Sequence, residues 1–298
     1  MLRRTHPLAL CIVLCGLVGV SHAVPTAIPV AYYDFEEIIN DEFFPNLISR
    51  SAYQGYLGTS PTDTSRHPDV VPGLHGSGQA LEFNSNDIAR VPTLVTDTNA
   101  DRIDEGVFSD AFSVFAFIDP PNANQMMVAN ADRGPLSTTV RGWYMDTCYS
   151  EQNAAGEYLL GLRFTAGSGG QYLTGGKTEA TNYKVVESYG VVYAPSSNPG
   201  VTSDGLMQIY INGQLIASKT HPGGAPYVGE AGFNIGFGNG VSWGSGIVID
   251  DLAVWNQAIS ADDMLYTHQH GVYVPEPATA TLLALGLLVP WLRRRRRR

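Results

Sequence analysis

Apolar and polar residues alternate in short stretches along residues 24–277, and no long stretch has the 3.6-residue period of an amphipathic helix. The clearest case is GLMQIYINGQLIAS (205–218), whose central Asn-Gly pair supplies the positive φ angles of a two-residue hairpin turn. FSVFAFI (112–118) and GIVIDDLAVWN (246–256) are also predicted strands. Both are largely apolar on both faces, which predicts central positions in a packed sheet.

One short helix is predicted after the last strand, in ISADDMLYTHQHG. Ser260 is the expected N-cap with Asp263 three residues later, and Gly271 is the expected stop signal. Glycine-rich and proline-rich segments such as SSNPGVTSDG and TAGSGGQYLTGG separate the strands. Many strands, long loops and almost no helix predict an all-β fold, a two-sheet antiparallel jelly-roll sandwich.

The N-terminus has the pattern of a secretory signal peptide. Arg3 and Arg4 precede an uncharged stretch, and small residues stand at Ser21 and Ala23, the two positions that signal peptidase inspects. The prediction is a signal peptide over residues 1–23, cleaved after Ala23. Of three cysteines, cleavage leaves only the one at position 148, so no internal disulfide is expected. A lone cysteine of this kind is expected to act as a small buried hydrophobe.

The C-terminus combines an apolar segment with a basic end. Residues 278–292 carry no charge and span about 22 Å as a helix, which is short against a hydrocarbon core of about 30 Å. Basic residues hold the end of such a segment at the cytoplasmic face. The precursor is therefore expected to be held transiently in the inner membrane, with both ends inside. The residues that set this topology are Arg293, Arg294, Arg295, Arg296, Arg297 and Arg298.

Pro275, Glu276 and Pro277 precede this apolar segment and its arginines, and residues 274–298 as a whole resemble the PEP-CTERM sorting signal of Gram-negative bacteria. The resemblance implies processing by a membrane-embedded exosortase and delivery to the cell surface or the extracellular matrix, often beside extracellular polysaccharide. A simple tail anchor with a chance Pro-Glu-Pro is the alternative.

Removal of both ends changes the charge of the protein. Eight of the 18 basic residues lie in residues 1–23 and 278–298, whereas all 28 acidic residues lie in residues 24–277. This exported part therefore has ten basic residues and a net charge of −18. Such a surface repels nucleic acid and anionic membranes and attracts divalent cations. No nucleic-acid partner is expected.

The order of elements in residues 24–273 resembles the LamG-like, concanavalin A-like jelly roll. Residues 38–75 form a longer insertion than is usual in that family, and Phe117 stands where a tryptophan is common. The resembling stretches are AYYDFEE (31–37), GQALEFNSNDIARVP (78–92), FSVFAFIDP (112–120), RGWYMDT (141–147), IYINGQLIA (209–217) and residues 246–272.

This resemblance implies one structural calcium ion. Asp34 in the first strand and Asp250 or Asp251 in the closing strand are the first candidates for its ligands, because the terminal strands of such jelly rolls tend to be neighbours. Strict alternation places Asp250 and Asp251 on opposite faces of their strand. The alternative is that these carboxylates are merely solvated or hydrogen-bonded at a sheet edge.

A glycan-binding surface would need exposed aromatic side chains. Trp243 and Tyr227 stand in glycine-rich loops and are the candidate ligand residues, although burial of Trp243 under its loop is an open alternative. Trp143 and Trp255 lie in strand-like stretches and are predicted to belong to the core.

No catalytic residue is predicted. The Glu-x-Asp-x-x-Glu string of jelly-roll glucanases is absent from the sequence. His268 and His270 are two positions apart on the predicted helix, so we expect them to be solvated and to offset the helix dipole. The sequence favours a binding protein for glycan or protein ligands. The alternatives are a structural matrix or adhesion component and a cryptic glycan hydrolase.

Overall fold

The computed structural model describes most of the predicted domain. It covers residues 27–49, 52–58, 60, 62–74, 78–84, 86–91, 107, 108, 110–119, 126–132, 141–152, 158–166, 171–178, 187–194, 204–222, 233–236, 246–272 and 274. The signal peptide, residues 275–298, Tyr227 and Trp243 lie outside the described residues, so what was predicted for them stays a prediction.

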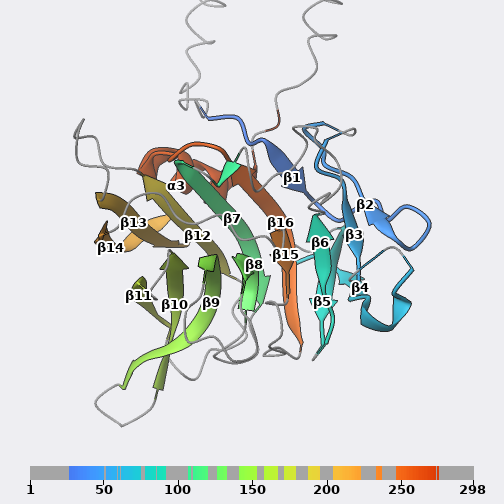
Figure 1. The fold of residues 1–298 in the computed structure, drawn as a ribbon, viewed down its shortest axis with the longest axis horizontal. Helices are drawn as coiled ribbons and strands as arrows, with labels where there is room; N and C mark the ends of the chain where they lie inside the picture. Colours follow the sequence, from blue (N-terminus) through green and yellow to red (C-terminus); the bar gives the residue numbers. More distant parts are fainter. Residues whose placement is uncertain are drawn as a thin grey trace, which may run out of the picture.

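Two eight-stranded antiparallel sheets form this part of the chain (Figure 1). Sheet A has the order β14 (Gln214–Pro222), β13 (Asp204–Ile211), β12 (Glu187–Ala194), β7 (Phe112–Asp119), β16 (Ile247–Trp255), β5 (Gln79–Phe83) and β4 (Asp69–Pro72), with β1 (Ala31–Tyr33) paired to β16. Sheet B has the order β11 (Gln171–Thr178), β10 (Tyr158–Ala166), β9 (Arg141–Gln152), β8 (Met126–Asp132), β15 (Phe233–Ile235), β6 (Ala89–Val91), β3 (Gly55–Leu57) and β2 (Phe43–Phe44). The predicted all-β, two-sheet antiparallel fold is confirmed.

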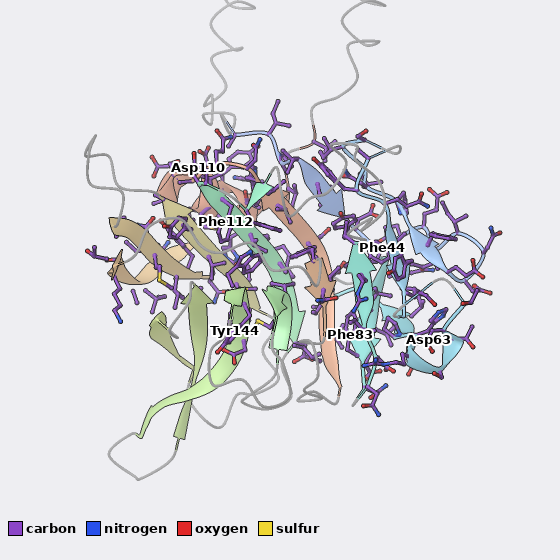
Figure 2. The ribbon with its side chains drawn as sticks, in the orientation of Figure 1. Phe44, Asp63, Phe83, Asp110, Phe112 and Tyr144 are labelled. Atoms are coloured by element: carbon purple, nitrogen blue, oxygen red, sulfur yellow. The ribbon has the colours of Figure 1, made fainter. Side chains whose placement is uncertain are left out.

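The main core lies between the two sheets. Val114, Ala116 and Ile118 of β7 point into it, and the intervening Phe115 and Phe117 are buried on the other face of sheet A. The prediction that this strand is buried on both faces is therefore confirmed. Trp143 and Trp255 are also core residues, as predicted, and are 0% and 2% exposed. Phe44 and Phe112, labelled in Figure 2, lie at different ends of the main core.

Helix α3 (Ala261–His270) covers the outer face of sheet A. The helix begins where predicted, because the Asp263 amide donates to Ser260 Oγ over 3.1 Å. Gly271, with a φ of 81°, caps its C-terminus. The helix packs tightly on β12, because a Cβ at Gly190 would lie 2.7 Å from Met264 Sδ. This outer cluster is a second, smaller core.

Both ends of the described chain reach the same outer face of sheet A. The Trp255 indole Nε1 donates to the Ala27 carbonyl over 3.3 Å, and Val272 packs against the cluster under α3. In Figure 1 the blue and red ends lie together, beside β1 and α3. The predicted export signal and the predicted sorting signal are thus joined to one side of the sandwich.

The predicted hairpin over 205–218 is confirmed as β13 and β14, with Asn212 and Gly213 at φ 52° and 72°. Other boundaries differ from the expectation. The first strand ends at Tyr33, because the next turn holds Phe35 in the left-handed region at φ 56°. The stretch 78–92 divides into β5 in sheet A and β6 in sheet B.

The long insertion 38–75 contributes strands to both sheets. It contains β2 and β3 at the edge of sheet B, the 3₁₀ helix Thr64–Arg66, and β4 at the edge of sheet A. Asn46 fixes its first part, because this fully buried amide accepts from the Tyr32 amide and donates to the Val30 and Ala52 carbonyls. The insertion is therefore part of the sandwich.

Candidate functional site at the bulge in β16

Strand β16 changes its neighbour at Asp250 and Asp251. One edge pairs with β5 along residues 247–249 and with β1 along residues 252–254. The pairing of the other edge with β7 shifts register between Asp250 and Ala253, and Asp251 has a φ of 50°. The two aspartates thus form a β-bulge at the point where β1 leaves the sheet and β5 enters it.

The turn after β1 brings two more carboxylates to this junction. Asp34 Oδ1 accepts a hydrogen bond from the Glu36 amide over 3.1 Å, and Glu36 Oε1 accepts one from the Gln79 amide over 3.0 Å. Gly78, at φ 83°, allows this approach, because a Cβ there would overlap the Glu36 carboxylate. The end of β1 is in this way attached to the start of β5.

Asp250 and Asp251 both contribute to the junction. Asp250 is 4% exposed and accepts from the Leu74 amide at Oδ2 over 3.0 Å and from the Asp251 amide at Oδ1 over 2.9 Å. Asp251 Oδ1 accepts from the Tyr32 hydroxyl over 2.5 Å. The expectation that the two carboxylates lie on opposite faces was wrong, because a bulge interrupts the alternation on which it depended.

We define the acidic junction as Tyr32, Asp34, Glu36, Asp250 and Asp251. Burial and electrostatic repulsion raise the pKa of three of its members, Tyr32, Asp34 and Asp250. Burial, and then the charge of Asp251, raise the pKa of Asp250 to about 7. Burial and the charges of Glu36 and Asp251 raise the pKa of Asp34. Burial and the Asp251 carboxylate raise the pKa of the Tyr32 phenol well above its usual range. The junction therefore favours a bound proton or cation.

The donor set is of the type that calcium prefers, since carboxylate oxygens predominate. Its arrangement is less suitable. Within the ranges described above, no three His, Cys, Asp or Glu side chains are placed so that they could hold a metal ion. Both oxygens of Asp250 and one of Asp251 are already engaged in hydrogen bonds. Calcium would thus have to draw Asp34, Glu36 and Asp251 together around it.

The sequence interpretation predicted part of this junction. Asp34, Asp250 and Asp251 lie together, and β1 and β16 are paired neighbours as expected. Tyr32 and Glu36 were missed, because neither belongs to a metal motif. The alternation of side chains along the first strand could have identified Tyr32. It lies between the buried Ala31 and Tyr33 and two positions before Asp34, so it shares the outer face with Asp34.

His268 is not simply solvated, contrary to the expectation. Its Nδ1 lies 3.0 Å from Ser188 Oγ, and the Ser188 amide donates to Asn212 Oδ1 over 3.1 Å. The contact between this serine and histidine attaches α3 to β12. Ser188 is 1% exposed, so its hydroxyl is inaccessible to a substrate, whereas His268 is partly exposed. His270 is exposed and contacts Tyr266, with ring centroids 4.5 Å apart and ring planes tilted by 48°.

The C-terminal residues match a known family. Residues 274–297 match the family model described as the PEP-CTERM protein-sorting motif. The match implies a precursor with a signal peptide and a C-terminal anchor, which exosortase sorts to the cell surface or extracellular space of a Gram-negative bacterium. No helix in the described ranges is long and apolar enough to span a membrane. No curated protein matches the chain in sequence.

Solved structures show the same type of β-sandwich at low sequence identity. A Trypanosoma rangeli sialidase bound to 2,3-difluorosialic acid has 14% identity and a TM-score of 0.54 over 85% of this chain. The binding domain of Paraclostridial mosquitocidal protein 1 has 11% identity and a TM-score of 0.53 over 81%. The chain spans 35% and 52% of these two proteins, respectively. At such identity the likeness concerns the fold alone.

Proposed function

We propose that this chain is the precursor of a cell-surface or extracellular-matrix protein whose LamG-like sandwich binds a ligand outside the cell, with glycan as the first candidate. The observation that carries the proposal is the sorting motif at residues 274–297, directly behind the domain. Helix α3 ends at His270, and Val272 still packs against the sandwich. The sandwich is therefore the cargo of the motif, attached with almost no linker.

Two further observations favour binding over catalysis. Ser188 and His268 are a serine and a histidine in hydrogen-bond contact, but the Ser188 side chain is buried in the structural link between β12 and α3. The acidic junction carries carboxylates without the cleft-facing spacing of a jelly-roll glucanase. A similar sandwich forms part of a sialidase and of the binding domain of a mosquitocidal protein, which supports the use of this scaffold for recognition.

Sorting is tested in a Gram-negative host that has an exosortase. Pro275, Glu276 and Pro277 are changed together to alanine, and cell fractions are probed for the sandwich. Prolines keep the neighbouring backbone extended, as a processing enzyme requires, so the variant should remain in the inner membrane as full-length precursor. Equal amounts of surface protein in the variant and the wild type would contradict the proposal.

Ligand binding is tested separately on a glycan array. A saturable signal that is lost in Trp243→Ala supports a glycan site in that loop. A surface-located protein without any glycan or protein ligand would instead be a structural matrix or adhesion component. Release of reducing ends from a bound glycan would indicate a hydrolase.

Calcium at the acidic junction is a second proposal, and the gathering of four carboxylates with raised pKa values at Asp34 and Asp250 favours it. The cation would offset their mutual repulsion and hold β1 against β16 and β5. Its role would be structural, because the junction joins strands.

A further inference from the structure

A row of paired residues crosses six strands of sheet B. Its members, which we call the Arg90 row, are Phe43, Tyr56, Arg90, Asn234, Ala129 and Tyr144, each the direct partner of the next. Directly paired residues have their side chains on the same face of a sheet, about 5 Å apart. The row therefore forms one transverse line of side chains from Phe43 on β2 to Tyr144 on β9, which is labelled in Figure 2.

This line lies on the face of sheet B that points away from the core. The residues on both sides of Arg90, Ala89 and Val91, belong to the main core, and so do Phe233 and Ile235 on both sides of Asn234. Side chains alternate along a strand, so Arg90 and Asn234 point outward. By the same alternation, Tyr56 points outward because its neighbour Leu57 is in the core.

Arg90 is held in one orientation on this face. Its Nε donates to Asn234 Oδ1 over 2.8 Å, and Asn234 is fully buried. The arginine itself is partly exposed. Within the described ranges Arg90 forms no ion pair, although the exported part of the chain has 28 acidic residues against ten basic ones. Its two terminal amino groups are thus available to an acceptor from outside.

Aromatic rings lie next to this guanidinium. Tyr56 is on the neighbouring strand and Phe43 on the strand after it, and both are partly exposed. Strand spacing puts them about 5 and 10 Å from Arg90. Aromatic faces stack on the apolar face of a sugar ring, and a guanidinium pairs with a carboxylate through two parallel hydrogen bonds. The combination fits a sugar that carries a carboxylate.

We propose that Arg90, with Tyr56 and Phe43 beside it, binds an acidic sugar residue of a glycan through its carboxylate. This inference rests on the proposed function, since it specifies the class of glycan. Asn234 accepts from Nε of the Arg90 guanidinium, so the two terminal amino groups of Arg90 are the ones that bind the carboxylate of the sugar. The negative charge of the rest of the domain disfavours nonspecific adsorption of polyanions, so recognition depends on this local site.

The test uses the full-length chain in a mild detergent, titrated by calorimetry with trigalacturonate and with its uncharged methyl ester. The wild type should bind trigalacturonate and should bind the ester at least about tenfold more weakly, because a hydrogen-bonded charge pair is lost. Arg90→Gln should lose the preference for the acid, and Arg90→Lys should restore it only in part because an ammonium cannot form the two-pronged pair.

Arg66→Gln is the matched control. Arg66 also donates through Nε, to the Asn86 carbonyl over 2.8 Å, and its replacement removes one positive charge from outside the row. It should keep the wild-type affinity and preference. Thermal melting of each variant establishes that it is folded. Tyr56→Ala leaves the Arg90–Asn234 hydrogen bond in place and should weaken the binding of both trigalacturonate and its methyl ester.

An unchanged preference for the acid in Arg90→Gln would overturn the inference, and so would a wild type that binds neither trigalacturonate nor a hyaluronan hexasaccharide. These results are distinct from failure of the proposed function. A neutral glycan signal that depends on Trp243 would leave glycan binding intact while excluding the Arg90 site. Equal loss of affinity in Arg66→Gln and Arg90→Gln would show that overall charge, and not the row, attracts the ligand.

Discussion

The Tyr32 hydroxyl donates a 2.5 Å hydrogen bond to the Asp251 carboxylate, although 219 positions separate the two residues in the sequence. The bond joins the first strand of the sandwich to the last at the place where β16 bulges. Because the β1 pairing is only three residues long, side-chain contacts of this kind are expected to contribute much of its stability.

We therefore expect Tyr32→Phe to lower the free energy of unfolding by about 1.5–3 kcal/mol, the usual range for a hydrogen bond to a charged group. Urea denaturation measures this change. Tyr266→Phe is the matched control, because Tyr266 makes a tilted ring contact with His270, which phenylalanine retains. If both variants lose the same stability, the Tyr32–Asp251 bond does not contribute as described.

Asp250 is expected to make the stability depend on pH. Its pKa rises from 3.8 in its ordinary state to about 7 in the fold. Between these values the folded protein binds a proton that the unfolded chain has lost. The contribution of Asp250 to the free energy of unfolding is therefore fully present below about pH 4 and is lost as the pH rises through about 7.

Asp250→Asn should remove this part of the pH dependence. The readout is the slope of the free energy of unfolding against pH between pH 4.5 and 7.5. Stability at a single pH is not a suitable readout, because asparagine also loses a hydrogen bond: each oxygen of Asp250 accepts from one backbone amide, and the NH2 group of asparagine cannot accept. The exposed Asp262→Asn should keep the wild-type slope. An Asp250→Asn slope equal to that of the wild type would contradict the raised pKa.

Calcium should stabilise the protein if it binds the acidic junction of the folded state. The melting temperature should then rise with the logarithm of free calcium and fall again with chelator, because the ion stabilises only the state that binds it. Asp34→Ala and Asp251→Ala should abolish the response, whereas Asp262→Ala should preserve it. The absence of any thermal response in the wild type would exclude calcium and leave the proton as the ion that relieves repulsion.

Local patterns in the sequence predicted the elements that depend on neighbouring residues. The hairpin at Asn212-Gly213 and the Ser260 cap need only a few adjacent side chains, and both are present as predicted. Helical spacing alone, in contrast, suggested solvation for His268. Its bond to Ser188 requires α3 to pack against β12, which no local pattern encodes.

The acidic junction was predictable only in part for the same reason. The bulge at Asp250 and Asp251 exists because β16 meets β5 on one side of it and β1 on the other. Glu36 reaches the junction by a contact with Gln79, 43 positions later. The Arg90 row likewise requires the register of β2, β3, β6 and β15, short strands whose pairing the sequence pattern did not show.

An intact-mass measurement of the surface protein shows whether residues 274–298 form a removable sorting signal behind an exported sandwich. The protein is expressed in a Gram-negative host that has an exosortase and is recovered from the cell surface. The expected mass lacks both residues 1–23 and the segment from Arg293 to Arg298. A surface form that still carries the six arginines would contradict it and would mean that the C-terminus is only an anchor.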